Sequence, residues 1–547
     1  MIKMKKILLL FVTLSTMFAA VSCIDKNDDP LDPEDIVNGV GGGMLRLTVK
    51  GAKLYTVSNI EISYANPAAP VGEVGARDMF GVDVPDVQLN EKDGIQFEIA
   101  MAHRTYNDVQ VKFMFTDREP VEVTIFETME LERGEVTQAE IKLPEIPGYA
   151  AGRLVRMDAS WVVQPAELTA KVAEMAGFSA DSFQYAFLMM ILNQYVVNPV
   201  HLDRIIYYTT DPAGDLVEAS GVVARQVGAA GEALDYTKLV SFQHGTCSIS
   251  AAPSYQSGIT AELLPVSITN PDAPADRYVA LMADYLGYGV SQTADLQHPY
   301  MHTKLTGSTC ADMLSAAEEF LEGASITVPG GKVDLVGYSQ GGAATIQTLL
   351  ELESRDFPDE RINEVYAGAG PYDLMAFFDF FMNNDNLYGR TGFVPYTFRG
   401  ICYGENITVD YSKIYNPSLM EKVNLENVFS TKQLDEWHSI LGSDMKAVLH
   451  PDFFKDNYGG NKEIIRLAEA IESNSVIKYG EPRNVAKIRL YHSKTDDTVP
   501  YVCSEHLQEA WPGLSEINVL KTDHNHAKGG IEFLLYYCGM ESLAALL

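Results

Sequence analysis

The sequence predicts two folded parts: a small all-β sandwich, followed by a larger α/β domain built on a mostly parallel, doubly wound sheet. Two observations support this prediction. Short runs of alternating apolar and polar residues fill 44–147, whereas strand-like and helix-like segments alternate through 148–547. The chain of 547 residues is also too long for one ordinary domain.

The beginning of the chain has the pattern of an export signal. A lysine-rich start precedes a short apolar run and small residues that end at position 22, as in a secretory signal peptide. We assign 1–22 to the signal, Cys23 to lipidation, and the Asp-, Pro- and Gly-rich 23–43 to a tether. Because Ala20 replaces the leucine usual in lipoprotein signals, an ordinary cleaved signal is the alternative. We expect an outer-membrane lipoprotein, at the cell surface or in the periplasm, held by lipid alone.

Residues 44–147 predict the β-sandwich. Alternating apolar runs separated by turn residues suit an antiparallel arrangement, and the runs begin at Leu45, Ile60, Ile95, Val109, Val121 and Ile141. The layout resembles the fimbrillin-type sandwich modules of Bacteroidetes surface proteins. The Pro- and Gly-containing stretch 144–148 predicts the domain boundary.

The second domain predicts strands that alternate with helices, and this order favours a parallel sheet covered on both faces. The expected strands are 204–209, 216–224, 239–243, 278–283, 333–336, 362–367, 488–491 and 517–520. The expected helices are 167–175, 183–195, 310–322, 342–350 and 531–537.

A long insertion separates two of these strands. About 120 residues between 367 and 488 exceed the length of a crossover helix, so we expect a helical cap over 372–482. Its helices are predicted near 430–441 and 462–473. The many aromatic residues of this region form either the cap's own core or the lining of an acyl pocket.

The candidate nucleophile is Ser339. The apolar run 333–336 leads into Gly337-Tyr338-Ser339-Gln340-Gly341, and a helix-forming stretch follows. A G-x-S-x-G pattern between a strand and a helix is typical of a nucleophile elbow, a strained turn that lifts the serine hydroxyl above the sheet. A glycine-rich turn with an idle serine is the alternative interpretation.

A serine nucleophile needs a base and a third group that orients the base. In this architecture the acid and then the histidine follow the serine along the chain, each after a strand. Asp496 directly follows an apolar strand and is the first candidate acid, with Asp497 second. His524 is the first histidine after the last predicted strand and is the expected base, with His526 second.

Acyl transfer also needs hydrogen-bond donors for the oxyanion. The backbone N–H of Gln340 is the first candidate, because this residue follows the nucleophile at a helix N-terminus. The loop after another strand offers the second, the N–H of Thr246, with Gly245 allowing a close approach. We expect His244 to brace this loop.

Five motifs in sequence order carry a family resemblance: Gln243-His244-Gly245-Thr246, Asp284-Tyr285-Leu286-Gly287-Tyr288-Gly289, His298-Pro299-Tyr300, Gly337-Tyr338-Ser339-Gln340-Gly341-Gly342 and Asp496-Asp497-Thr498-Val499-Pro500. Together they resemble the α/β-hydrolase superfamily, within it the secretory lipase and esterase-like branch. The resemblance covers about 150–547. It implies a Ser–His–Asp carboxylic ester hydrolase with a helical lid and with no metal or organic cofactor. It says nothing about the sandwich.

The composition argues against some classes of binding partner. A net charge of −33 argues against nucleic acid, which needs clustered basic residues. No Cys/His spacing suggests zinc, and the five cysteines after Cys23 are an odd number. The expected substrate is a small ester or one carried by a glycan or lipid, and the oligomeric state stays open. The alternatives are a serine exopeptidase, marked by a glutamate pair in the cap, and a non-catalytic surface-binding protein.

Overall fold

The computed structural model describes residues 42–544 except 52–54, 66–76, 90–93, 116–118, 145–147, 176–178, 180, 249–250, 256–262, 270–275, 294–295, 384–389, 433, 484–486, 522 and 524. The expected signal peptide, Cys23 and nearly all of the expected tether therefore lie outside the described residues. The chain forms two compact units, which separate between Tyr149 and Ala150; only the short segment Ala213–Leu216 departs from this division. In the described part of the chain, no helix has the length and apolar character needed to span a bilayer.

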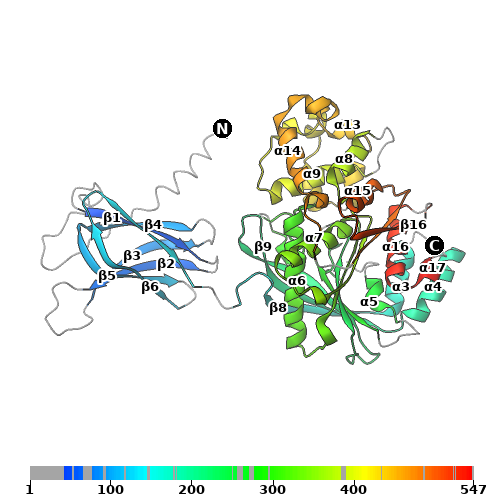
Figure 1. Ribbon diagram of the computed structural model, residues 1–547, viewed down its shortest axis with the longest axis horizontal. Helices are drawn as coiled ribbons and strands as arrows, with labels where there is room; N and C mark the ends of the chain where they lie inside the picture. The colour runs from blue at the N-terminus through cyan, green and yellow to red at the C-terminus, as the bar shows by residue number, and fades with distance from the viewer. Residues whose placement is uncertain are drawn as a thin grey trace. The chain divides into compact units, whose positions relative to one another are not determined.

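The first unit is all-β (Figure 1). Its strands are β1 (Gly42–Lys50), β2 (Thr56–Ala65), β3 (Arg77–Gln88), β4 (Ile95–Ala102), β5 (Arg104–Phe115), β6 (Val121–Leu131) and β7 (Val136–Lys142). They form two sheets, ordered β4-β1-β7 and β3-β2-β5-β6. Alternate side chains of each strand are buried, as the period of two requires; examples are Leu45, Leu47 and Val49 in β1.

Two features of this unit differ from the prediction. The strand β3 was not predicted, because Asp78, Pro85 and Asp86 interrupt its apolar alternation. It lies at a sheet edge, where such residues are tolerated. The pairing of β1 with β7 is parallel, whereas an antiparallel sandwich was expected; the pairs β1–β4, β2–β3, β2–β5 and β5–β6 are antiparallel.

The second unit is built on a nine-stranded, mostly parallel sheet with the order β16-β15-β14-β13-β11-β12-β10-β9-β8. The five pairs among β11 to β16 are parallel, and the pairs β10–β12 and β8–β9 are antiparallel. The strands are β8 (Leu154–Val163), β9 (Val200–Thr210), β10 (Leu216–Gln226), β11 (Lys238–Gln243), β12 (Tyr278–Ala283), β13 (Val333–Tyr338), β14 (Ile362–Gly368), β15 (Ile488–Ser493) and β16 (Ser515–Leu520). The predicted α/β class is confirmed, although the edge strand β8 was missed.

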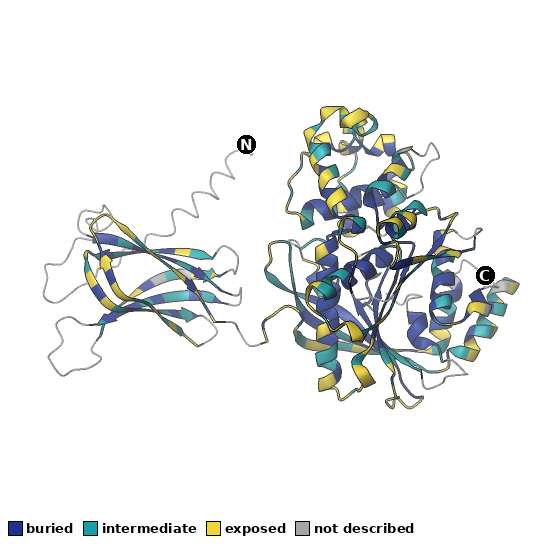
Figure 2. Ribbon diagram, viewed as in Figure 1, coloured by how far each residue is buried: buried dark blue, intermediate teal, exposed yellow. Residues whose placement is uncertain are grey.

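Helices cover both faces of this sheet, and each face has its own apolar core. One core includes α6 (Thr303–Gly323), α7 (Gln340–Ser354) and α15 (Val502–Ala510). The other includes α3 (Pro165–Met175), α4 (Phe183–Tyr195), α5 (Leu264–Ser267), α16 (His526–Tyr537) and α17 (Glu541–Ala544). Neighbouring residues of β13 point to opposite cores, Leu335 to the first and Val336 to the second. Figure 2 shows the resulting buried interior.

A helical region lies between β14 and β15, where the insertion was predicted (Figure 1, yellow to orange). We call it the cap. Its helices are α8 (Leu374–Asn383), α9 (Phe393–Gly404), α10 (Pro417–Met420), α11 (Leu425–Thr431), α12 (Leu434–Leu441), α13 (Met445–Val448) and α14 (Lys462–Ser473). They share a third apolar core that contains Phe377, Phe398 and Trp437, and Tyr300 and Cys503 from outside the cap join it. Many of the aromatic residues therefore form the cap's own core.

Candidate functional site

Ser339 occupies a strained turn between β13 and α7. Its backbone φ is 63° and ψ is −126°, a left-handed region that residues with a Cβ rarely adopt. Tight packing holds the turn, because a Cβ on Gly341 would lie 2.0 Å from the Gln243 carbonyl oxygen, and one on Gly342 would lie 2.3 Å from the Gly368 carbonyl oxygen. The glycines of the motif are therefore required by close backbone approach, as an elbow demands.

The loop after β11 lies directly beside this turn. Strand β11 pairs in parallel with β13, with Gln243 opposite Gly337, so their carboxyl ends meet at one edge of the sheet. A Cβ placed on Gly245 would lie 3.9 Å from the Cβ of Ser339. Thr246 follows in the chain, and Gln340 is the first residue of α7, whose N–H has no partner within the helix. Both predicted oxyanion donors thus belong to segments adjacent to Ser339.

His244 lies within this loop. Its Nδ1 is 2.7 Å from the Gly245 carbonyl oxygen, and its ring stacks on Tyr285 with centroids 4.1 Å apart. The Tyr285 hydroxyl donates to the His244 carbonyl oxygen at 2.9 Å. These contacts fit the bracing role expected for His244.

Asp496 follows β15 and is buried with both carboxylate oxygens engaged. Its Oδ1 accepts the backbone N–H groups of Thr498 and Val499, each at 2.8 Å. Its Oδ2 lies 2.7 Å from Nδ1 of His526. Burial alone would raise the pKa of the Asp496 carboxyl, but the His526 imidazole with its hydrogen bond, together with the nearby His492, outweighs burial and holds this pKa well below its usual range.

His526, the second candidate base, directs its imidazole to the acid. His524, the first candidate, lies outside the described residues. With Nδ1 directed to Asp496, the Nε2 of His526 is buried and has no hydrogen-bond partner among the described residues. The ring packs against Tyr338, the residue before Ser339, with centroids 5.0 Å apart, and the Tyr338 hydroxyl donates to the His526 carbonyl oxygen at 2.9 Å. The described geometry therefore gives His526 the contacts expected of the base, and His524 stays a prediction.

Asp497, the second candidate acid, contacts a different part of His526. Its Oδ1 accepts the backbone N–H of His526 at 3.1 Å and the Thr498 hydroxyl at 3.2 Å. His526 is the first residue of α16, where a carboxylate satisfies a free N–H and favours the helix dipole. Asp496 holds the imidazole, and Asp497 holds the start of the helix.

Two further histidines support the site, and sequence reasoning gave neither a role. His492 is fully buried and its Nε2 lies 3.0 Å from the Val499 carbonyl oxygen and 3.6 Å from Oδ2 of Asp496. His298 precedes the serine in the chain, whereas the expected base follows it. Its Nδ1 lies 2.9 Å from the Leu286 carbonyl oxygen, and its Nε2 lies 2.8 Å from the side-chain nitrogen of Gln340.

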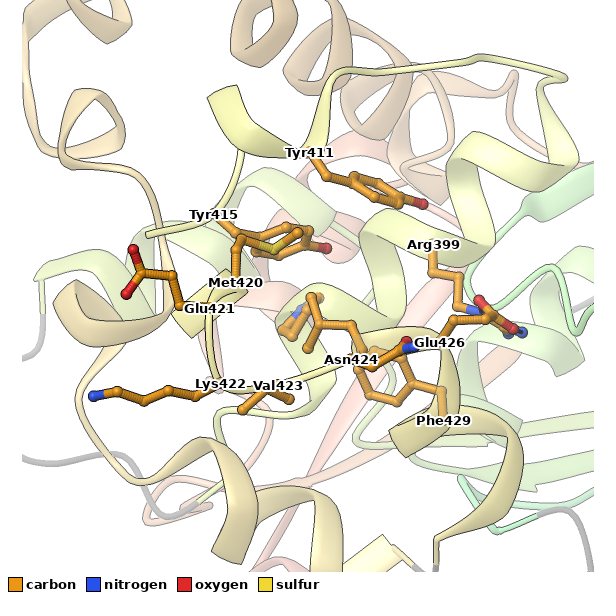
Figure 3. A pocket seen from close by; sticks show the side chains of 12 residues that line it. Arg399, Tyr411, Tyr415, Met420, Glu421, Lys422, Val423, Asn424, Glu426 and Phe429 are labelled. Carbon is orange, nitrogen blue, oxygen red and sulfur yellow. Dashed lines mark hydrogen bonds and ion pairs between the residues drawn. The ribbon is translucent and has the colours of Figure 1, made fainter. Parts of the chain in front are cut away.

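Two cavities lie in the cap. The first has a volume of about 470 Å³ and is lined by Pro395, Arg399, Tyr411, Tyr415, Met420, Glu421, Lys422, Val423, Asn424, Leu425, Glu426 and Phe429 (Figure 3). At one side of it Arg399 pairs with Glu426. The second, of about 420 Å³, is lined by residues of the range 375–471, among them Phe378, Phe398 and Phe453. Neither lining includes a candidate catalytic residue.

The described residues contain no cluster of three or more His, Cys, Asp or Glu side chains with metal-binding geometry. The five described cysteines, 247, 310, 402, 503 and 538, are not joined to one another by disulfides.

Solved structures share this fold. A protein of Legionella pneumophila, described provisionally as a hydrolase, is 22% identical with a TM-score of 0.56; the match covers 72% of this chain and 98% of that one. The rice cell wall degrading esterase LipA from Xanthomonas oryzae is 21% identical with a TM-score of 0.52, and the match covers 73% of this chain and 97% of that one. No protein-family model matches the chain, and no curated protein matches it significantly. At these identities the likeness concerns the fold.

Proposed function

We propose that this protein is a serine hydrolase that cleaves carboxylic esters, with Ser339 as nucleophile, His526 as general base and Asp496 as the group that orients the base. The single observation that carries the proposal is the set of contacts made by the His526 imidazole. Its Nδ1 contacts Asp496 at 2.7 Å, its Nε2 is unpartnered among the described residues, and its ring packs on Tyr338 next to the strained serine. A serine nucleophile, a histidine base and an acid that orients the base are the groups that acyl transfer requires.

The proposed reaction has two halves. The Ser339 hydroxyl attacks the ester carbonyl carbon while its proton passes to Nε2 of His526, and the backbone N–H groups of Gln340 and Thr246 stabilise the oxyanion. His526 then gives the proton to the leaving alcohol, and an acyl group remains on Ser339. In the second half, His526 removes a proton from water, which attacks the acyl group and releases the acid and the serine.

Two lines of support favour esters over peptides. The fold is shared with LipA, a rice cell wall degrading esterase. An exopeptidase would be expected to bind the free amine of its substrate with a carboxylate pair; in the first cap cavity Glu426 already pairs with Arg399. The physiological substrate in this proposal is an ester carried by a small molecule, a glycan or a lipid.

The location is a separate part of the proposal. The pattern of 1–22 favours export, and Cys23 is the proposed site of a lipid anchor at the outer membrane. Metabolic labelling with radioactive palmitate tests it. The label is expected on the wild-type chain and not on Cys23→Ser; equal labelling of both would contradict the assignment.

Hydrolysis of p-nitrophenyl butyrate tests the activity. The wild type is expected to release p-nitrophenol, and Ser339→Ala is expected to lose at least about 10³-fold in kcat. Aminoacyl p-nitroanilides provide the comparison substrate. Cleavage of the anilides alone would establish the exopeptidase alternative, and an inactive wild type on both substrate classes would favour a non-catalytic binding protein.

A further inference from the structure

We propose that Tyr288 and the cap residue Tyr396 are positioning residues for the oxyanion donors, so that the cap holds the oxyanion loop in its productive geometry. This inference rests on the proposed function. The oxyanion loop is here the segment from His244 to Cys247. Two buried hydroxyls connect cap helix α9 to the carbonyl of Cys247, the residue after the Thr246 donor.

The hydrogen bonds have a defined direction. The Tyr288 hydroxyl donates its proton to the Cys247 carbonyl oxygen at 3.0 Å. The hydroxyl oxygen of Tyr288 lies 2.8 Å from the Tyr396 hydroxyl oxygen. Because Tyr288 has one hydroxyl proton and it is engaged, Tyr396 is the donor in the second bond. The chain of bonds therefore runs from the cap through Tyr288 to the oxyanion loop.

A second contact connects the same parts. The Thr246 hydroxyl lies 2.8 Å from the Tyr300 hydroxyl, and the ring of Tyr300 is 4.7 Å from that of Tyr396. Helix α9 presses on Tyr300, because a Cβ on Gly400 would lie 2.3 Å from the Tyr300 backbone nitrogen. Both the side chain of Thr246 and the carbonyl of the next residue are thus fixed by tyrosines packed against α9.

The other donor joins the same cluster. His298 stacks on Tyr288 with centroids 4.5 Å apart, and its Nε2 is 2.8 Å from the Gln340 side-chain nitrogen. The backbone N–H of Gln340 is the second proposed oxyanion donor. Tyr288 therefore touches the supports of both donors, one through its hydroxyl and one through its ring.

Burial makes these bonds hard to replace. Tyr288, Tyr300 and Tyr396 are 0%, 2% and 1% exposed, and Tyr396 is enclosed on the cap side by Phe429 and Trp437 at 5.1 and 4.6 Å. When a hydroxyl is removed from this cluster, its former hydrogen-bond partner stays buried and has no water with which to replace the bond. An oxyanion hole depends on donors fixed before the reaction, so a loosened loop lowers stabilisation of the transition state more than binding of the substrate.

The test compares Tyr288→Phe and Tyr396→Phe, which keep the rings and remove the hydroxyls. We expect kcat for p-nitrophenyl butyrate to fall about tenfold in Tyr288→Phe and about threefold in Tyr396→Phe, with KM within about twofold of wild type. The double variant should equal Tyr288→Phe, because the two bonds form one chain. Binding of a trifluoromethyl ketone, whose adduct places an oxyanion in the hole, should weaken by the same factors; binding of the matching methyl ketone should not.

Tyr236→Phe is the matched control. Tyr236 is also buried, and its hydroxyl donates to the Gln226 carbonyl oxygen at 2.7 Å, but it precedes β11 and so lies at the opposite end of that strand from the oxyanion loop. This variant should lose stability comparably and keep its kcat. If Ser339→Ala is inactive while Tyr288→Phe keeps wild-type kcat and ketone affinity, the inference is wrong and the proposed function stands. If Ser339→Ala keeps its activity, the proposed function itself fails.

Discussion

Two buried histidines near Ser339 differ in what their ring nitrogens do. His526 directs Nδ1 to the carboxylate of Asp496 and keeps Nε2 unpartnered among the described residues. His298 has both nitrogens engaged, one with the Leu286 carbonyl and one with Gln340. Burial lowers the pKa of His298 to about 3, so it stays neutral at physiological pH. An imidazole with a carboxylate and an idle nitrogen can move a proton, whereas one with both nitrogens occupied can only hold its neighbours in place.

The largest expected effect on kcat comes from removing the carboxylate that His526 contacts. Asp496→Asn should lower kcat about 10⁴-fold, because an amide at this position no longer stabilises the imidazolium or selects its tautomer. Asp497→Asn is the matched control; it alters the acceptor for the His526 N–H and the Thr498 hydroxyl at the start of α16, and its kcat should fall by less than about tenfold. Steady-state hydrolysis of p-nitrophenyl butyrate measures both. Equal losses in the two variants would contradict the separate roles given to the neighbouring aspartates.

Substitutions of two glycines test the packing around the proposed oxyanion donors. Gly245→Ala should fold normally, because the nearest atom to the new Cβ is 3.6 Å away, but its methyl group would sit beside Ser339 and lower kcat/KM about tenfold. Gly341→Ala should lower the free energy of unfolding by about 1–3 kcal/mol, because its Cβ would lie 2.0 Å from the Gln243 carbonyl oxygen. Kinetics and thermal unfolding separate the two effects. A stable Gly341→Ala, or a Gly245→Ala with unchanged kinetics, would show that the loop and elbow are less tightly packed than described.

The smallest expected effect is a dependence of folding stability on pH, caused by the protonation of His298. Its pKa is about 3 when folded and near 6.5 when unfolded, so the unfolded state binds more protons between these values. Stability therefore falls as pH drops below about 6.5. By pH 5 the loss from this group is about 2 kcal/mol.

His298→Gln removes this titration while keeping a donor and an acceptor. Urea unfolding at pH 7.5 and pH 5 should show a smaller loss of stability in the variant than in the wild type. Tryptophan fluorescence reports the relevant unit, since all three tryptophans, Trp161, Trp437 and Trp511, lie in it. Identical losses in the two proteins would mean that His298 is not held neutral in the fold.

Much of the second unit could be predicted, because strong local patterns set it. Predicted helices 183–195 and 462–473 agree with α4 and α14, and the G-x-S-x-G turn lies between β13 and α7 as expected. Strands β3 and β8 were missed because Asp78, Pro85 and Asp86 in β3 and Arg156 and Asp158 in β8 interrupt the apolar alternation, which an edge position tolerates. The periodicity of the chain thus revealed the elements whose apolar pattern is unbroken.

The supporting side chains were harder to predict, because their partners lie far away in sequence. His298 and Gln340 are 42 residues apart, and no local pattern connects them. The choice between His524 and His526 could not be made from their order after the last strand, since that order says nothing about helix geometry. A capping signal was present: Asn525 accepts the N–H of Lys528 at 3.1 Å and starts α16 at His526.

The most direct test is the rate at which a p-nitrophenyl phosphonate ester modifies the protein, with the site identified by peptide mass spectrometry. The account predicts one adduct per chain, on Ser339, formed at a similar rate in the wild type and in His524→Gln and at least about 10³-fold more slowly in His526→Gln. An adduct on another residue, or undiminished labelling of Ser339 in His526→Gln, would contradict it.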